Sequence, residues 1–188
     1  MAKGNYSKKP QTTNVATVGL EMGKVPPQAL DLEEAVLGAM MLEKDAIMNV
    51  MDVLKPEAFY KDAHQKIFMA ISRLSTRMEP IDIYTVSQEL KRTEELDLVG
   101  GPYYLTQLTL KVGSAAHVAF HAKIIAQKYI QRELIRISSD IQRNSFDETI
   151  DVEELLDTAQ MEIFNLAEGN VKKEALKMDS IVKDAIAQ

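Results

Sequence analysis

The stretch PPQALDLEEAVLGAMML, residues 26–42, decides the fold of this chain. It sets a Pro-Pro pair directly before a stripe of apolar positions, Leu30, Ala35, Leu37 and Met41. Glu33 and Glu34 lie in the first turn, where carboxylates complement the positive end of a helix. The stretch therefore predicts a helix that begins sharply after the prolines.

The composition is that of a soluble, folded chain. Its 188 residues are 46% hydrophobic and 27% charged, enough for one sizeable core or two small ones. The net charge of −6 argues against a protein-wide electrostatic grip on nucleic acid, so any DNA contact would be local. Cysteine is absent, which excludes disulfides and thiolate zinc sites. No apolar run suits a signal peptide or membrane span, so we expect a cytoplasmic protein without a membrane partner.

From residue 45 onward the chain shows helical periodicity and no convincing strand pattern. After a helix over about 45–54, Asp62 can cap a helix whose apolar face carries His64, Ile67, Phe68, Ile71, Leu74 and Met78. Pro80 ends this helix, Asp82 caps the next one, and Gly100-Gly101-Pro102 marks a further restart. We read His64 as a hydrogen-bonded packing residue. The predicted fold is all-α: a compact orthogonal helical domain, a long antiparallel helical hairpin and a short linker helix.

The hairpin is predicted from two long amphipathic helices. One runs from a Ser114 cap to about Arg143, and the other covers about 152–168 after an Asp151 cap. The first helix is mainly basic and the second carries only acidic charges, which favours antiparallel pairing, although each exposed ion pair contributes only about 0–1 kcal/mol. Apolar residues at steps of three and four predict two facing seams. The predicted hairpin and oligomer interface consists of Ile130, Leu134, Ile137, Ile141, Val152, Leu156, Ile163 and Leu166.

Further apolar residues lie beside or beyond these seams and leave open what covers the hairpin. They are Phe120, Ile124, Ile125, Tyr129, Leu155 and Phe164. Either the globular helices of the same chain cover them, or a second hairpin packs on the first in a four-helix arrangement.

We expect four segments along the chain: a flexible basic tail at 1–24, a globular helical domain at 25–112, the hairpin at 113–169, and a linker with the start of a linker helix at 170–188. The tail has a net charge of +3, which fits a solvated terminus better than a DNA-binding arm. The last segment is either a disordered end or an amphipathic helix that needs a partner surface. Its apolar stripe includes Ile181, Val182, Ala185 and Ile186. Because it ends without a stop signal, we expect a continuing parent chain.

An ordered series of motifs resembles the N-terminal domain of DnaB-type replicative DNA helicases and covers about residues 26–188. After the opening stretch come Phe59-Tyr60 with His64 and Ile67-Phe68, Pro80-Ile81-Asp82 with Thr85, Gly100-Gly101 with Tyr104-Leu105, and Arg132-Glu133-Leu134-Ile135. Two positions depart from the family pattern. Ala29 stands where many relatives have a capping Ser or Asn, and His121 stands where tyrosine is common.

This resemblance implies a scaffold rather than a motor. In such helicases these domains form the collar of a hexameric ring, arranged as a trimer of dimers. A separate RecA-like domain hydrolyses ATP with Mg and moves 5′ to 3′ along single-stranded DNA. The implied partners are other copies of the chain (as a dimer, trimer of dimers or hexamer), primase, a helicase loader, and single-stranded DNA through the parent ring. The linker helix with Ile181, Val182, Ala185 and Ile186 would dock on a neighbouring motor domain.

No catalytic, cofactor or metal site is expected in this chain. Its eight glycines do not form the GxxxxGK[ST] loop that cradles phosphates, so we expect no enzyme activity and no bound cofactor. His117 and His121 are spaced like two metal ligands, but Val118 replaces the glutamate of a metalloprotease helix and no third ligand is evident. Two alternatives stay open: a free-standing helical module that binds single-stranded nucleic acid through the tail or the arm at 123–143, and a metal-dependent hydrolase built on the two histidines.

Overall fold

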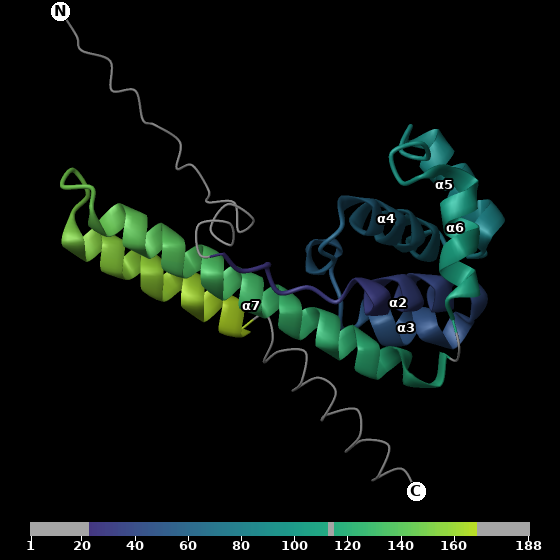
Figure 1. Cartoon of the computed structure of the whole chain (residues 1–188), viewed down its shortest axis with the longest axis horizontal. Coiled ribbons are helices and arrows are strands. Elements are labelled where there is room, and N and C mark those ends of the chain that lie inside the picture. The colour runs from purple at the N-terminus through teal and green to yellow at the C-terminus, as the bar shows by residue number, and fades with distance from the viewer. Residues whose placement is uncertain (1–22, 113–114, 169–188) are drawn as a thin grey trace, which may run out of the picture. The chain divides into compact units, whose positions relative to one another are not determined.

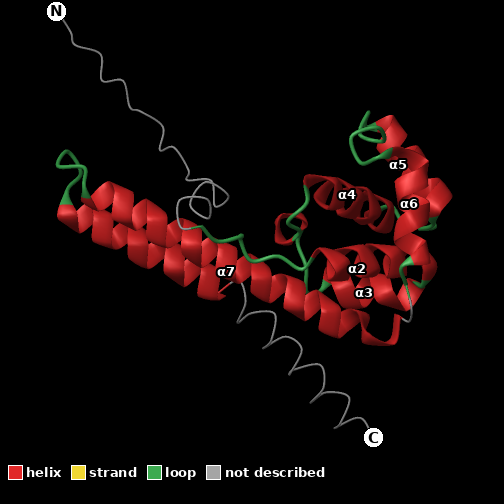
Figure 2. Cartoon of the chain, in the orientation of Figure 1, coloured by secondary structure: helices red, strands yellow, loops and turns green. Residues whose placement is uncertain are grey.

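The computed structural model describes residues 23–112 and 115–168. In these ranges all regular secondary structure is helical, so the prediction of an all-α fold is confirmed (Figure 2). The contacts divide the chain into two units, which are described separately below. We call residues 27–131 the globular unit and residues 132–168 the hairpin unit.

The globular unit is a cluster of short helices around α2 (Figure 1). Helix α2 packs against α3, α4 and α6, and α4 and α6 in turn pack against α5. A 3₁₀ turn at Pro56–Ala58 precedes α4, and another at Ala115–His117 precedes the helix α7. The helices are α2 (Leu30–Leu42), α3 (Lys44–Met51), α4 (Asp62–Thr76), α5 (Ile83–Arg92), α6 (Gly101–Leu110) and the first half of α7 (Val118–Ser145).

Helix α2 is the centre of the hydrophobic core. Val36, Leu37 and Met40 are fully buried, and they belong to one cluster with apolar residues of the other helices. Gly38 allows α2 to approach α6 closely, because a Cβ at this position would lie 2.2 Å from the carbonyl oxygen of Leu108. The close crossing of α2 and α6 therefore requires a glycine here.

Two of the predicted helix starts have different outcomes. Asp82 caps α5 as predicted: its Oδ1 accepts from the backbone N–H of Thr85 at 2.8 Å, and the Thr85 hydroxyl accepts from the backbone N–H of Asp82 at 2.9 Å. The prediction that Asp62 caps α4 is wrong. Lys61 is the N-cap residue, and Asp62 is the first residue of the helix, where its carboxylate still complements the helix dipole.

The end of α4 also differs from the prediction. The helix ends at Thr76, so Met78 does not extend its apolar face. Instead Met78 adopts a left-handed conformation with φ 55°, and its side chain is 94% exposed. The backbone N–H of Met78 donates to Ser75, and that of Glu79 donates to Leu74, both at 3.0 Å. These two bonds form a Schellman motif, which closes the helix before Pro80 would.

Other helix boundaries shift by a few residues. Helix α3 ends at Met51, earlier than the predicted 54, and α7 begins at Val118 after the 3₁₀ turn and continues to Ser145. Ser114, the predicted cap of α7, lies outside the described residues.

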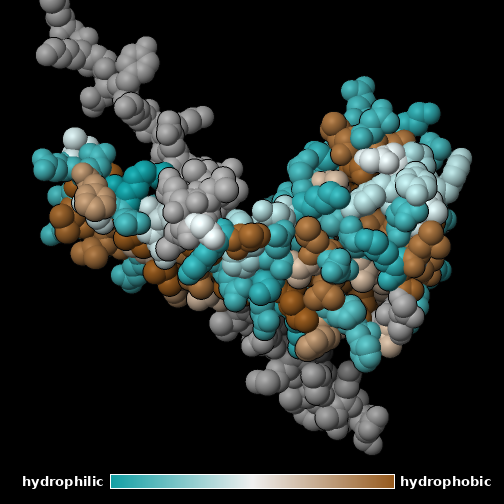
Figure 3. All heavy atoms as spheres, viewed as in Figure 1, coloured by the Kyte–Doolittle hydropathy of each residue, from teal (hydrophilic) through white to brown (hydrophobic). Residues whose placement is uncertain are grey.

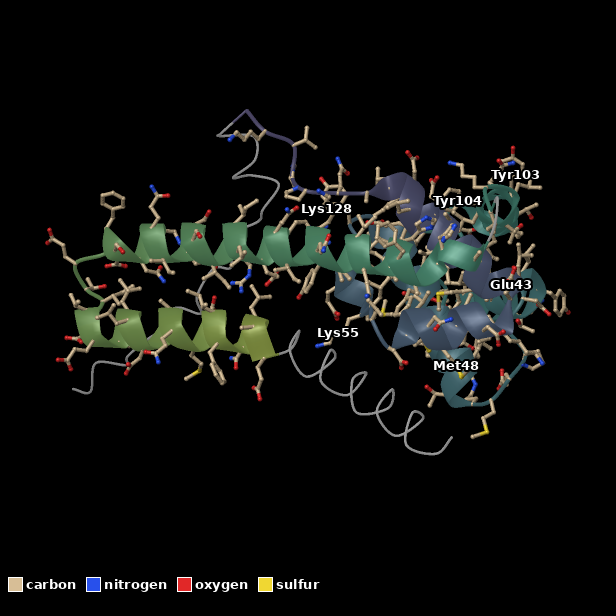
Figure 4. All side chains as sticks on the ribbon, turned by 90° about the horizontal axis from the view of Figure 1, so that it is seen from below. Glu43, Met48, Lys55, Tyr103, Tyr104 and Lys128 are labelled. Atoms are coloured by element: carbon tan, nitrogen blue, oxygen red, sulfur yellow. The ribbon has the colours of Figure 1, made fainter. Side chains whose placement is uncertain are left out.

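The hairpin unit consists of the second half of α7 and a helix over residues 152–168, which we call the acidic arm. The two helices run antiparallel, side by side (Figures 1 and 4). As predicted, Asp151 caps the acidic arm, because its Oδ1 accepts from the backbone N–H of Glu153 at 2.8 Å. Arg136 of α7 donates to Glu162 of the acidic arm at 3.3 Å, in agreement with the predicted pairing of a basic with an acidic helix.

Candidate functional site

The predicted interface residues of the hairpin unit fall into two groups. Ile137 is buried, and Ile141 and Leu166 are half-buried. The second group is exposed in the single chain: Leu134 by 46%, Val152 by 69%, Leu156 by 64% and Ile163 by 49%. The eighth residue, Ile130, is half-buried in the globular unit.

These exposures correct the sequence-based picture of two seams closed within one hairpin. Two helices touch along one line, and on the acidic arm the half-buried apolar residues are Leu155, Ala159 and Leu166 rather than Val152, Leu156 and Ile163. The last three residues lie on another part of the arm and face solvent. Their place in an interface with a second copy of the chain stays a prediction.

The exposed apolar surface of the hairpin unit extends beyond the predicted residues. Phe146, Met161 and Phe164 are also mostly exposed, and apolar side chains gather along the hairpin in Figure 3. Val152, Leu156 and Ile163 lie four and seven residues apart and therefore share one side of the acidic arm, and we call these three exposed residues the apolar face. Several exposed apolar side chains on one side of a helix are typical of an interaction site.

Of the apolar residues that lie beside or beyond the predicted seams, some are covered and others are exposed. In the globular unit, Ile125 is buried in the core, and Tyr129 is half-buried against it. In contrast, Phe120 and Phe164 stay mostly exposed. The globular helices thus cover part of the surplus and leave the rest to solvent.

The linker-helix residues Ile181, Val182, Ala185 and Ile186 lie outside the described residues, as does the tail over residues 1–22.

A buried polar cluster occupies the globular unit between α2, α4 and α6. The carboxylate of Glu33 is 1% exposed and accepts from the backbone N–H of Tyr60 at 2.8 Å. Its other oxygen lies 2.6 Å from Nδ1 of His64, which is fully buried. Nε2 of His64 lies 2.7 Å from the hydroxyl of Tyr104, whose position is labelled in Figure 4. The prediction that His64 is a hydrogen-bonded packing residue is confirmed.

The cluster continues to the surface through Glu34. Its carboxylate accepts from the hydroxyl of Tyr104 at 3.2 Å and from the ammonium of Lys111. Partial burial alone would raise the pKa of Glu34, but the hydrogen bonds from Lys111 and Tyr104 outweigh it and hold this pKa below its ordinary value. Burial raises the pKa of Tyr104, although Lys61 donates to its hydroxyl at 3.0 Å.

The order Glu33, His64, Tyr104 has the form of a carboxylate, a base and a hydroxyl, as in nucleophilic triads. In this structure the contacts of the three side chains tie α2, α4 and α6 together. Sequence reasoning took Glu33 for a residue that complements the helix dipole and missed this role, because its partner His64 lies 31 positions away.

The described residues contain no group of three or more His, Cys, Asp or Glu side chains that could hold a metal ion. His117 is exposed in the 3₁₀ turn, and His121 is half-buried on α7. None of the described helices is both long and apolar enough to cross a membrane.

The described residues thus define the class of all-α proteins, with a globular unit of short helices and a two-helix hairpin unit. The model of the family described as DnaB-like helicase N terminal domain matches residues 25–127. The chain belongs to this family.

Two curated relatives agree with this assignment. The replicative DNA helicase DnaB of Rhodothermus marinus is 44% identical over 166 residues, which are 88% of this chain and 18% of the relative. The replicative DNA helicase DnaB of Geobacillus stearothermophilus is 39% identical over 145 residues, 77% of this chain and 32% of the relative. The chain thus spans less than a third of the length of either relative.

Two solved structures share the fold. The N-terminal domain of DnaB helicase from Mycobacterium tuberculosis is 40% identical with a TM-score of 0.72, and the match covers 75% of this chain and 99% of that one. A structure described as a DnaB-like replicative helicase and its interactions with primase has a TM-score of 0.61 at 24% identity. That match covers 73% of this chain and 31% of the other, and at this identity it shows the fold alone.

Proposed function

We propose that this chain is the collar and scaffold domain of a replicative DNA helicase and acts through self-association and partner docking. Membership of the DnaB-like family supports the proposal, and the observation that carries it is the apolar face of the acidic arm. In this proposal, unwinding in the 5′ to 3′ direction with ATP and Mg belongs to a motor domain of the parent protein. Single-stranded DNA passes through the parent ring, in the cytoplasm.

Self-association follows from the free energy of covering the apolar face. Val152, Leu156 and Ile163 recur at steps of four and seven along one helix, so a single partner surface can cover all three. Fully burying one such side chain stabilises a complex by about 1.5–3 kcal/mol relative to leaving it in water. A twofold contact that uses the same face on both copies needs no second surface, so a dimer is the expected unit. A trimer of dimers or a hexamer then builds the collar.

The test measures the mass of the chain in solution at several concentrations by sedimentation equilibrium. We expect the mass to rise with concentration in the wild type. Leu156→Asp and Ile163→Asp should reduce this rise, because each would bury a charge in the interface. Thr158→Asp, an exposed position on the same arm, is the matched control. Because these residues face solvent in the single chain, melting of the monomer should change little. A wild-type chain that stays monomeric at every concentration would refute the proposal.

Docking of primase and of a helicase loader is the second part of the proposal. It is supported by family membership and by the fold match to a helicase described together with its primase interactions. Calorimetric titration of the chain with the primase and the loader of the same organism tests this part. Saturable binding is expected for primase. A chain that self-associates but binds neither partner would limit the function to oligomerisation.

Titration of the isolated chain with labelled single-stranded DNA tests the alternative hypothesis of a free-standing module that binds single-stranded nucleic acid. Such a module would bind labelled single-stranded DNA with an affinity that falls steeply with salt. With a net charge of −6, we expect no such binding by the isolated chain at physiological ionic strength.

A further inference from the structure

A charged groove lies on the globular unit between the end of α4 and one face of α5. Its volume is about 800 Å³. We call it the α5 groove; the residues that matter for the argument are Arg77, Tyr84, Gln88, Lys91 and Arg92, with the carboxylates Glu79 and Glu89. Tyr84, Gln88, Lys91 and Arg92 recur at steps of three and four, so they share one face of the helix.

The floor of the groove is built around the buried carboxylate of Glu89. It accepts from Arg73 Nε at 2.8 Å, from Arg77 Nη2 at 2.7 Å and from Arg92 Nη2 at 2.7 Å. Hydrogen bonds from Arg92 first, and then from the other two arginines, outweigh the effect of burial and hold the pKa of Glu89 far below its ordinary value. Glu89 therefore stays ionised at any physiological pH and fixes the guanidinium groups in place.

The rim of the groove keeps unused hydrogen-bond donors. Arg92 binds Glu89 through Nε and Nη2, which leaves Nη1 for another acceptor. Lys91 and Gln88 are exposed, and no hydrogen bond within the described part of the chain uses their side chains. Tyr84 adds a ring that is 72% exposed. The fixed arginine lowers the entropy cost of binding an anion here, because its rotamer is already ordered.

The charge of the groove is opposite in sign to that of the whole chain. Three cations, Arg77, Lys91 and Arg92, and two carboxylates, Glu79 and Glu89, line it, which gives a net charge of +1. The chain as a whole has a net charge of −6. A local reversal of this kind favours an anionic partner at this place.

We propose that the α5 groove docks an acidic peptide segment of a partner protein. Its carboxylates would bind Lys91 and Arg92, and an apolar side chain would pack on the ring of Tyr84. A nucleic-acid strand fits less well, because the single ring of Tyr84 offers little stacking for successive bases. The inference goes beyond the proposed collar role and does not depend on self-association, since the apolar face lies in the other unit.

The test titrates the full chain into a short fluorescein-labelled peptide rich in glutamate with one central phenylalanine, and follows fluorescence anisotropy. We expect saturable binding that weakens with salt. Lys91→Glu should weaken it about tenfold or more, because it removes one charge-assisted contact and adds a repulsive charge. Lys55→Glu is the matched control, since Lys55 is exposed on a different part of the unit (Figure 4). Tyr84→Ala should also weaken binding without changing the melting temperature.

Three outcomes would overturn the inference. One is the absence of saturable binding by the wild-type chain, and another is equal weakening by Lys91→Glu and Lys55→Glu, which would reveal unspecific charge attraction. The third uses oligo-dT as a second probe. If oligo-dT binds more tightly than the peptide and loses its binding in Lys91→Glu, the groove is a nucleic-acid site instead. Because the collar proposal is tested by solution mass, its failure stays distinguishable from a failure here.

Discussion

Replacing Glu33 with alanine tests whether the buried polar cluster holds the globular unit together. Glu33 is 1% exposed and accepts two hydrogen bonds, from the backbone N–H of Tyr60 at 2.8 Å and from Nδ1 of His64 at 2.6 Å. Glu33→Ala removes both acceptors at once. Both donors stay at least partly screened from water, because His64 is fully buried and Tyr60 is half-buried.

The magnitude follows from the two orphaned donors. A buried donor without an acceptor costs about 1–3 kcal/mol, and more when it is charged. The expected loss in the free energy of unfolding is therefore about 3 kcal/mol or more. For a unit of this size, that loss lowers the melting temperature by roughly 10–20 °C.

The measurement is urea unfolding followed by circular dichroism, with the m-value checked for change. Glu43→Ala is the matched control, because Glu43 is exposed and its side chain makes no cap hydrogen bond. A double-mutant cycle with His64→Ala should give a coupling energy of about 1–3 kcal/mol. The reasoning is refuted if Glu33→Ala and Glu43→Ala lower stability equally, or if the effects of Glu33→Ala and His64→Ala simply add.

Three further substitutions probe the fold at other places. Gly38→Ala should destabilise the chain by about 1 kcal/mol in chemical denaturation, because overpacking against Leu108 costs about 1–3 kcal/mol and is only partly offset by the roughly 1 kcal/mol gained in helix propensity. A more stable variant would contradict the close crossing. Met78→Gly should stabilise by about 0.5–1 kcal/mol, because glycine adopts φ 55° without strain, and a loss of stability would speak against the Schellman motif. For Glu89, whose pKa is lowered in the folded state, the stabilising contribution is fully present above the ordinary carboxyl pKa and is lost as the pH falls through the lowered value. The free energy of unfolding of Glu89→Gln should thus be lower than that of the wild type by a constant amount around neutral pH, and this difference should decrease only in acid. A difference that already disappears between pH 7 and pH 5 would contradict the lowered pKa of Glu89.

The sequence predicts best what is decided within one helical turn. Asp82 and Thr85 stand three residues apart, and their capping bonds form whenever a helix starts there. Asp151 caps the acidic arm for the same reason. The apolar periodicity of α4 likewise identifies a helix, because its spacing of three and four residues is itself the helical repeat. In α2 the predicted stripe is partly wrong, because Leu30 is exposed whereas Val36 and Met40, which lie outside it, are fully buried.

Features that depend on distant residues could not be predicted in the same way. The role of Glu33 is set by His64 and Tyr104, which come from two other helices. A first-turn glutamate is usually solvated, so the local pattern favoured the helix dipole. Met78 fits the apolar spacing of α4, yet the chain leaves the helix two residues earlier because the Schellman bonds close it at Thr76. The apolar spacing continues beyond the last helical residue, so spacing alone does not locate the end of a helix.

In the hairpin unit, too, the sequence pattern does not predict which apolar residues are buried within one chain. Periodicity marks both Ile137 and Leu156 as apolar positions of long helices, but Ile137 is buried in the single chain whereas Leu156 is 64% exposed. Such a pattern indicates that one face of a helix is apolar and needs to be covered, but it does not indicate which surface covers it. This difference in exposure between Ile137 and Leu156 lets substitutions test the stability of one chain and the association of two chains separately. If the chain self-associates as proposed, truncating Ile137 should act on the fold of one chain, while a charge at Leu156 should act on the complex. An apolar position at which a charge leaves the monomer stable but abolishes association would therefore identify a surface that binds a second copy.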